Sequence, residues 1–129
     1  VRDSLIRRGI QLAVRHGAAI PGARISDTIK RVNEDGSIRE TIDRDSLRAV
    51  QTPQLFQRAL LERAHRSNAD RGSENATDDA VLVEAIGHTV HVYESESPNL
   101  KVTTPQDLVV AEAYLLPKQV PPRSTRNLR

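Results

Sequence analysis

The chain has 129 residues, of which 37% are hydrophobic and 28% are charged, and it contains no cysteine. This length allows one domain with its own core, and the composition is typical of a globular rather than a disordered protein. The sequence shows no apolar run long enough to cross a bilayer and no secretory leader pattern. The absence of cysteine excludes a disulfide framework, a thiolate nucleophile and a cysteine-ligated zinc site, and we expect a cytoplasmic protein.

The formal net charge of +2 arises at one end of the chain. Residues 117–129 contain four basic residues and no acidic one, so the remainder of the chain is slightly acidic. Three prolines and few apolar residues predict that this tail is disordered. No aromatic residue accompanies its charge, which leaves nucleic-acid binding by the tail as the weaker alternative.

The N-terminal segment predicts a helix that ends at Gly17. Its apolar residues recur near helical spacing and would form the buried stripe: Leu5, Ile6, Ile10, Ala13 and Val14. Because this pattern begins almost at residue 1, without an initiator methionine, we expect the chain to be part of a longer protein. The short apolar run "AAIP" at residues 18–21 predicts a buried strand.

Residues 25–43, "ISDTIKRVNEDGSIRETID", predict a β-hairpin because two β-favouring runs flank a turn sequence at residues 33–36. The two strands offer few apolar side chains for burial: Ile29, Val32, Ile38 and Ile42. A long polar hairpin is only marginally stable by itself. We therefore expect this hairpin to pack against another protein surface, and we favour a second copy of the chain.

Two further helices are predicted in the middle of the chain. Thr52, followed by Pro53, is expected to cap a helix that runs to about residue 68. Either Thr77 or Asp78 is expected to cap the next helix, which ends at Gly87.

The remaining elements complete the fold class. Residues 88–95 and 99–103 predict strands, and Thr104 followed by Pro105 predicts the start of a last helix. Strands that alternate with helices indicate an α/β fold with a partly parallel sheet, and no internal repeat is present.

Threonine at a predicted helix start has two interpretations. As an N-cap it stabilises the helix by about 1 kcal/mol. Alternatively, the free N–H groups and the helix dipole bind an anion beyond the carboxyl ends of the strands. The threonines concerned are Thr52, Thr77 and Thr104.

Two basic residues are candidates for the same crevice. Lys101 lies in a predicted strand that leads directly to a helix cap, where its amine would reach bound anions or would protect an edge strand from aggregation. Arg44 follows the hairpin; by itself it is explained as a solvated hairpin residue, and its guanidinium would suit a phosphate if one lies near.

The sequence gives little support for a metal site. Asp78 and Asp79 are adjacent acids in a first helical turn, where they complement the helix dipole. His88 and His91 are expected on opposite faces of a strand and would not chelate together, and His16 has no partner pattern.

Four blocks in this order resemble the 2-C-methyl-D-erythritol 4-phosphate cytidylyltransferases of the non-mevalonate isoprenoid pathway. The blocks are "SDTIKRV", "TIDRDSLRAVQTPQLF", "TDDAVLVEAIG" and "NLKVTTPQDLVVAEAYLL". The resemblance covers residues 1–116 and implies the C-terminal half of a single Rossmann-like nucleotidyltransferase domain. It also implies that the hairpin, at about residues 27–44, is an arm that embraces the other subunit of a homodimer.

The resemblance also implies an activity and residue roles. Members join methylerythritol phosphate to CTP with release of pyrophosphate, and Mg²⁺ accompanies the triphosphate. By similarity, Thr28 and Arg44 would hold the substrate phosphate in the partner's site, while Thr52 and Thr77 would line the pocket of their own subunit. Lys101 would be the catalytic residue, in contact with the attacking phosphate and the charge that develops near the α-phosphate.

The resemblance lacks one half of the family pattern. No segment matches the Gly-rich loop that cradles CTP or the later acidic motif near the metal, so we expect this chain to be inactive alone. Two alternatives stay open: a ribitol-5-phosphate cytidylyltransferase, and a non-catalytic dimerisation module derived from such an enzyme.

Overall fold

The computed structural model describes residues 1–71, 76–95 and 99–116. The predicted disorder of residues 117–129 falls outside this described part. Two compact units, Val1–Asn99 and Leu100–Arg129, are described separately below.

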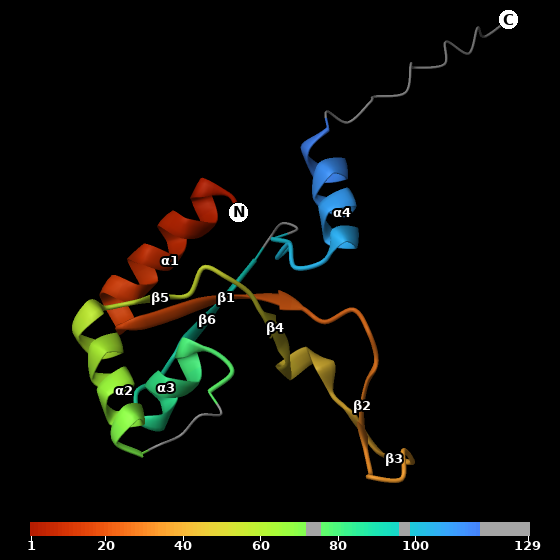
Figure 1. Cartoon of the computed structure of the whole chain (residues 1–129), viewed down its shortest axis with the longest axis horizontal. Coiled ribbons are helices and arrows are strands. Elements are labelled where there is room, and N and C mark those ends of the chain that lie inside the picture. The colour runs from red at the N-terminus through yellow and green to blue at the C-terminus, as the bar shows by residue number, and fades with distance from the viewer. Residues whose placement is uncertain (72–75, 96–98, 117–129) are drawn as a thin grey trace, which may run out of the picture. The chain divides into compact units, whose positions relative to one another are not determined.

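A mixed four-stranded sheet organises the first unit (Figure 1). Its central strand, β1 (Ala18–Arg24), pairs in parallel with β6 (His91–Glu94) and antiparallel with β4 (Arg48–Val50) and β5 (Leu55–Phe56). The expectation of an α/β fold with a partly parallel sheet is confirmed.

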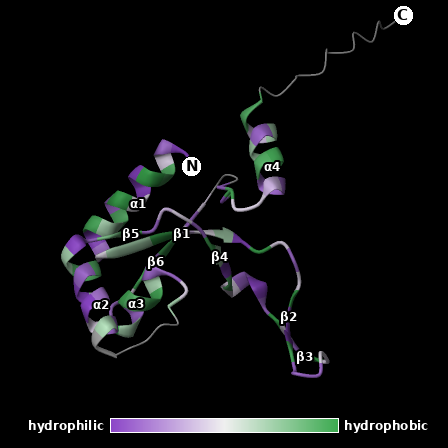
Figure 2. Ribbon diagram, viewed as in Figure 1, coloured by the Kyte–Doolittle hydropathy of each residue, from purple (hydrophilic) through white to green (hydrophobic). Residues whose placement is uncertain are grey.

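Helix α1 (Asp3–His16) covers one face of the sheet, and it ends at Gly17, whose φ of 86° suits glycine. Figure 2 shows hydrophobic and hydrophilic residues alternating along α1, as in an amphipathic helix. Ala13 packs with Ala19 and Tyr93 in a buried cluster. The predicted stripe is only partly correct, because Ile10 is 48% exposed and Val14 is 71% exposed.

The opposite face of β1 carries the second cluster. Ala18 lies there because successive strand residues point to opposite sides. It packs against α2 (Arg58–Arg71) and α3 (Asp79–Ala85). The buried side chains that these helices contribute are Leu60, Ala64, Leu82 and Val83.

The prediction that Thr52 caps a helix is wrong. Thr52 and Pro53 lie in the connection between β4 and β5, and α2 begins only at Arg58. Leu55 and Phe56 pair with the start of β1 instead of forming a helical stripe, because backbone pairing and burial beside β1 override local helix signals.

The hairpin prediction is confirmed. Strands β2 (Ile29–Val32) and β3 (Ile38–Ile42) form a separate two-stranded sheet, followed by the short 3₁₀ helix η1 (Arg44–Ser46). Val32 is 57% exposed and Ile38 is 62% exposed. The apolar side chains of the hairpin are therefore largely unburied within one copy of the chain.

At the start of the second unit, one predicted strand is absent from the described residues. Residues 99–103 form no strand, so Lys101 is not a strand residue. The predicted helix is present as α4 (Pro105–Leu115), capped by Thr104 as expected. Within the described residues, no helix combines the length and apolarity needed to cross a membrane.

Candidate functional site

Thr52 lies in a connection that hydrogen bonds tie to two other segments. The Gln54 side-chain amide donates to Asp78 Oδ2 at 2.7 Å. The Asn99 side-chain amide donates to the carbonyl oxygen of Thr52. The structure therefore joins the Thr52 segment to the start of α3 on one side and to residue 99 on the other.

Thr77 lies beside this junction but does not cap α3. Asp78 is the N-cap, because its Oδ1 accepts from the Val81 amide at 3.0 Å. Thr52 and Thr77 are both exposed residues. Of the predicted site residues, these two are brought onto segments that contact each other.

Arg44 and Thr28 belong to a second group, at the base of the hairpin. Arg44 begins η1, and its guanidinium donates to the carbonyl oxygen of Ser26, two residues before Thr28. Asp43 caps η1 by accepting from the Asp45 amide at 3.1 Å. Among the described contacts, none joins this group to Thr52 or Thr77.

Lys101 belongs to the second unit, where it is exposed. The capping box that follows it is tightly bonded. Asp107 accepts hydrogen bonds from the Thr103 and Thr104 amides at 3.0 and 2.8 Å. These amides, with the two threonine hydroxyls, lower the pKa of Asp107 to about 2. The carboxylate therefore fixes the backbone immediately after Lys101.

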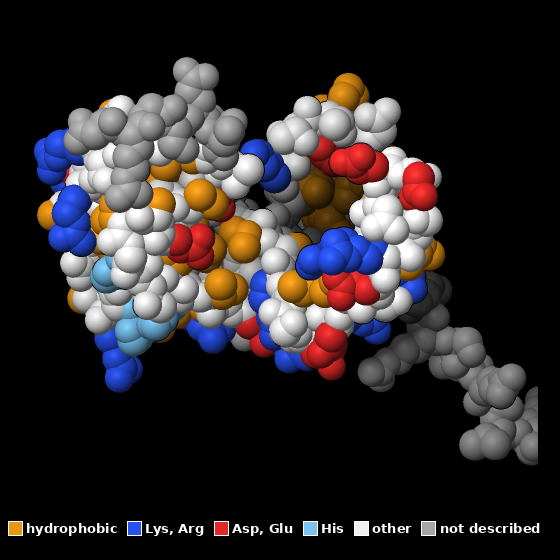
Figure 3. All heavy atoms as spheres, turned by 90° about the horizontal axis from the view of Figure 1, so that it is seen from below, with side chains coloured by type: hydrophobic (Ala, Val, Ile, Leu, Met, Phe, Trp, Pro, Cys, Tyr) orange, Lys and Arg blue, Asp and Glu red, His pale blue; other side chains and the backbone are white. Residues whose placement is uncertain are grey.

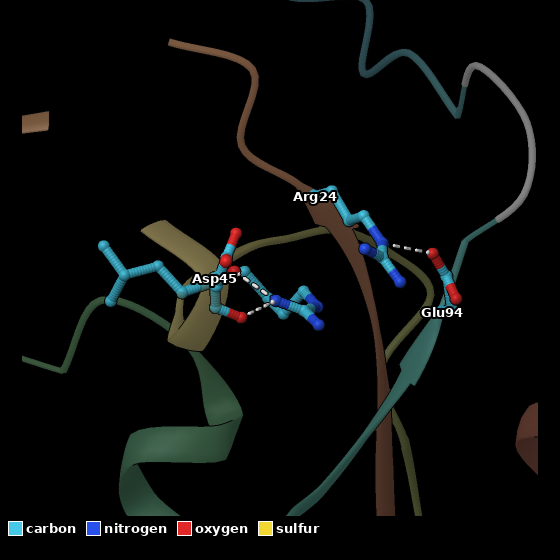
Figure 4. Close-up of polar contacts among 5 residues, drawn as sticks. Arg24, Asp45 and Glu94 are labelled. Atoms are coloured by element: carbon cyan, nitrogen blue, oxygen red, sulfur yellow. Dashed lines mark hydrogen bonds and ion pairs between the residues drawn. The ribbon is translucent and has the colours of Figure 1, made fainter. Parts of the chain in front are cut away.

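An ion pair that the sequence did not indicate joins the carboxyl ends of the two parallel strands (Figure 4). Arg24, the last residue of β1, donates through Nε to Glu94 Oε1 of β6 at 2.9 Å. This hydrogen bond raises the pKa of Arg24 and lowers the pKa of Glu94.

A hollow of about 620 Å³ lies beside this pair. Arg48 in its wall donates to the carbonyl oxygens of Asp45 and Leu47 at 2.9 and 2.6 Å, so part of its guanidinium is committed to the backbone. The hollow is lined by charged, polar and apolar side chains: Asp45, Ser46, Leu47, Arg48, Val50, Val92, Tyr93 and Glu94.

The acids and histidines considered for metal binding are occupied by other contacts. Asp79 Oδ1 lies 2.9 Å from His65 Nε2, and Asp78 is shared between Gln54 and the α3 cap. The rings of His16 and His91 meet edge to face at 4.0 Å. Among the described residues, no three His, Cys, Asp or Glu side chains are grouped as metal ligands.

Sequence reasoning missed the residues that connect these segments. Gln54 lies in the motif "TPQ" and Asn99 opens the block "NLKVT". The sequence does not reveal which residue the side-chain amide of a glutamine or asparagine will bond to. Arg24 and Glu94 were detectable in principle, because both lie at the ends of strands that an α/β fold aligns.

These features define a mixed-sheet α/β protein, a class in which ligands bind beyond the carboxyl ends of parallel strands. Residues 1–117 match the family described as "IspD: 2-C-methyl-D-erythritol 4-phosphate cytidylyltransferase". The chain belongs to this family.

Relatives and solved structures agree with the family. The chain is 49% identical to a 2-C-methyl-D-erythritol 4-phosphate cytidylyltransferase of Geobacillus kaustophilus, with 89% of this chain and 50% of the relative covered. It is 45% identical to a bifunctional enzyme IspD/IspF of Nitrobacter winogradskyi, with 89% of this chain and 29% of the relative covered.

A crystal structure of the cytidylyltransferase from Thermus thermophilus superposes with a TM-score of 0.78 at 42% identity, covering 88% of this chain and 55% of that one. The chain thus spans about half the length, or less, of the relatives that it matches.

Proposed function

We propose that this chain is the C-terminal portion of a cytidylyltransferase that joins 2-C-methyl-D-erythritol 4-phosphate to CTP and releases pyrophosphate. The observation that carries the proposal is the family match over residues 1–117. The contact between the Thr52 segment and the start of α3 supports it, because both segments carry a predicted substrate-binding residue.

The predicted residue roles divide between two subunits. Thr52 and Thr77 would hold the sugar phosphate from within one subunit. Thr28 and Arg44, at the base of the hairpin, would reach the site of the partner subunit in a homodimer. The bond between Arg44 and the Ser26 carbonyl supports a shared role for this second group, because it fixes the two segments together.

Lys101 would act where the two phosphates meet. A phosphate monoester dianion must approach a triphosphate, so like charges have to be brought together and neutralised. Cations and oriented donors accomplish this by positioning and electrostatics, with little covalent chemistry. An exposed lysine amine followed by a rigid cap meets this requirement.

CTP and its Mg²⁺ would be bound mainly by sequence outside these residues. The described part of the chain contains no group of three His, Cys, Asp or Glu side chains placed to hold a metal ion. Magnesium, when bound with CTP, would supply charge neutralisation on the triphosphate.

The test is CTP-dependent pyrophosphate release, measured for this 129-residue chain and for the complete polypeptide encoded by its reading frame. We expect turnover of methylerythritol phosphate by the complete polypeptide and none by the chain alone. Preference for ribitol 5-phosphate would redirect the substrate assignment. No release with either sugar phosphate would refute the proposed activity and favour a dimerisation module.

A further inference from the structure

We propose that Gln54 is a positioning residue of the sugar-phosphate site, an inference that rests on the proposed function. Its side-chain amide links the segment that carries Thr52 to the helix cap that follows Thr77. In this role Gln54 sets the spacing of the two threonine hydroxyls without touching the substrate itself.

The link ends on a fixed anchor. Asp78 uses Oδ2 to accept from Gln54 Nε2 at 2.7 Å and Oδ1 to accept from the Val81 amide at 3.0 Å. Helix α3 is itself held in the core, because Leu82 is only 5% exposed and Val83 is fully buried. Any movement of Gln54 relative to Asp78 is therefore a movement of the Thr52 segment relative to the core.

The backbone of the Thr52 segment is fixed at its start, because the Gln51 amide donates to the Pro21 carbonyl oxygen of β1 at 2.8 Å. It lies between the three residues of β4 and the two residues of β5, and Thr52 itself is exposed. Its other side-chain contact in the described structure is the hydrogen bond from Asn99 to the Thr52 carbonyl oxygen. After Gln51, the side-chain bonds that hold the segment in the described structure are those of Gln54 and Asn99, and only the Gln54 bond reaches the segment that carries Thr77.

In the hydrogen bond between Gln54 and Asp78, the donor and acceptor roles are fixed by the two side chains. Gln54 and Asp78 are both half-buried, and a hydrogen bond to a carboxylate is stronger than one between neutral groups. The partner of Asp78 must be a donor, which a glutamine supplies and a glutamate does not. Breaking the link would therefore loosen both threonine segments together.

The test inverts donor and acceptor. Gln54→Glu places two carboxylates opposite each other and should break the link. Asp78→Asn alone should have little effect on KM for methylerythritol phosphate. The asparagine Oδ1 can still cap α3, and Gln54 can rotate its amide so that its oxygen accepts from the asparagine. The double variant Gln54→Glu/Asp78→Asn restores a donor opposite an acceptor. Gln57→Glu is the control, because Gln57 bonds to the Ala13 and Val14 carbonyl oxygens instead.

In the complete polypeptide, we expect Gln54→Glu to raise KM for methylerythritol phosphate about 10-fold while KM for CTP stays within about twofold. The double variant should recover most of this loss. The inference is overturned if Gln54→Glu leaves the sugar-phosphate KM unchanged, or if the double variant is no better than Gln54→Glu. A change in kcat alone, shared by Gln57→Glu, would indicate a merely structural role and would also overturn it.

A second readout does not depend on turnover. In amide NMR spectra of the complete polypeptide, Gln54→Glu should shift the signals of Thr52 and Thr77 together, and the double variant should return both. If the unmodified polypeptide proves inactive, the proposed function fails, while these spectra still decide whether the two segments are linked. Shifts confined to residues 52–55 would refute the link.

Discussion

The guanidinium of Arg44 already has a partner within its own chain, the carbonyl oxygen of Ser26. A guanidinium carries five N–H donors, so one such bond fixes its orientation and leaves donors for an anion. In the proposed role, this bond would orient the Arg44 guanidinium toward the sugar phosphate before it binds.

Replacing Arg44 with alanine should weaken sugar-phosphate binding selectively. Loss of a charge-assisted hydrogen bond corresponds to about 1.5–3 kcal/mol, or roughly a 10- to 150-fold rise in KM for methylerythritol phosphate. Steady-state kinetics of the complete polypeptide measure this, with Arg39→Ala on the exposed strand β3 as the control. Equal effects on the sugar-phosphate and CTP constants would contradict the assignment of Arg44.

Gly9 illustrates a residue fixed by space rather than by chemistry. A Cβ atom at this position of α1 would lie 2.3 Å from both Leu55 Cδ1 and Tyr93 Oη. Tyr93 cannot retreat freely, because its hydroxyl donates to the Leu5 carbonyl oxygen at 3.2 Å. The close approach of α1 to the sheet therefore requires glycine here.

Gly9→Ala should lower the free energy of unfolding by about 1–3 kcal/mol through overpacking. Urea denaturation of the complete polypeptide measures the change. Val14→Ala on the same helix, where the valine is 71% exposed, should change stability by no more than about 0.5 kcal/mol. A neutral Gly9→Ala variant would mean that α1 packs less closely than the structure indicates.

At the scale of elements, local sequence signals determined some helices and strands, and tertiary contacts determined others. The caps at Gly17 and Thr104 and the hairpin turn are local, so the sequence predicted α1, α4 and the hairpin. Thr52 carried a helix signal as well, but pairing of Leu55 with Ala19 decided its structure. Such pairing joins residues far apart in the chain and leaves no local pattern.

The same reason explains what was missed at the site. Thr52, Thr77 and Lys101 were chosen from helix-start and strand patterns, and the family resemblance then assigned their expected roles. The hydrogen bonds that hold the segments of Thr52 and Thr77 join residues 24 and 47 positions apart in the chain. No periodicity or spacing rule predicts contacts of that kind.

The cap of α4 should show an acid transition. Asp107 has a folded-state pKa of about 2, lowered from 3.8 by the bonds from Thr103 and Thr104. Because the pKa is depressed, the cap's stabilisation is fully present above the ordinary value and is lost as pH falls toward about 2. An NMR titration of the Asp107 carboxyl carbon should give this midpoint, and Thr104→Ala should raise it. A midpoint near 3.8 in the unmodified polypeptide would contradict the capping box.

The junction of α1 and β6 should respond to pH in a higher range. Partial burial, then His91 and then Arg15, lower the pKa of His16 from 6.5. The unfolded chain therefore takes up a proton more readily than the folded one, and stability declines as pH falls below 6.5. His16→Gln should reduce this decline in denaturant melts between about pH 7 and 5. An unchanged pH profile would mean that His16 does not contribute.

At the scale of the whole molecule, the proposed site draws residues from two subunits. Mixing Arg44→Ala with Lys101→Ala enzyme should then restore activity, because a mixed dimer contains one site that has both groups. Activity is measured after subunit exchange. Native mass spectrometry follows the exchange, with the two variants carrying tags of different mass. Complete exchange without recovery would argue that each site is built from one subunit.

Helix α4 has little packing within the described structure, and this bears on its stability. On the face drawn in Figure 3, hydrophobic side chains are interspersed with acidic and basic ones. None of the eleven residues of α4 is buried, and Leu115 is 84% exposed. So short a peptide does not hold a helical conformation in water unaided, however well its end is capped. If the chain is part of a larger enzyme, as proposed, residues 105–115 should become more helical when the rest of that enzyme is present, and amide hydrogen exchange measures this change.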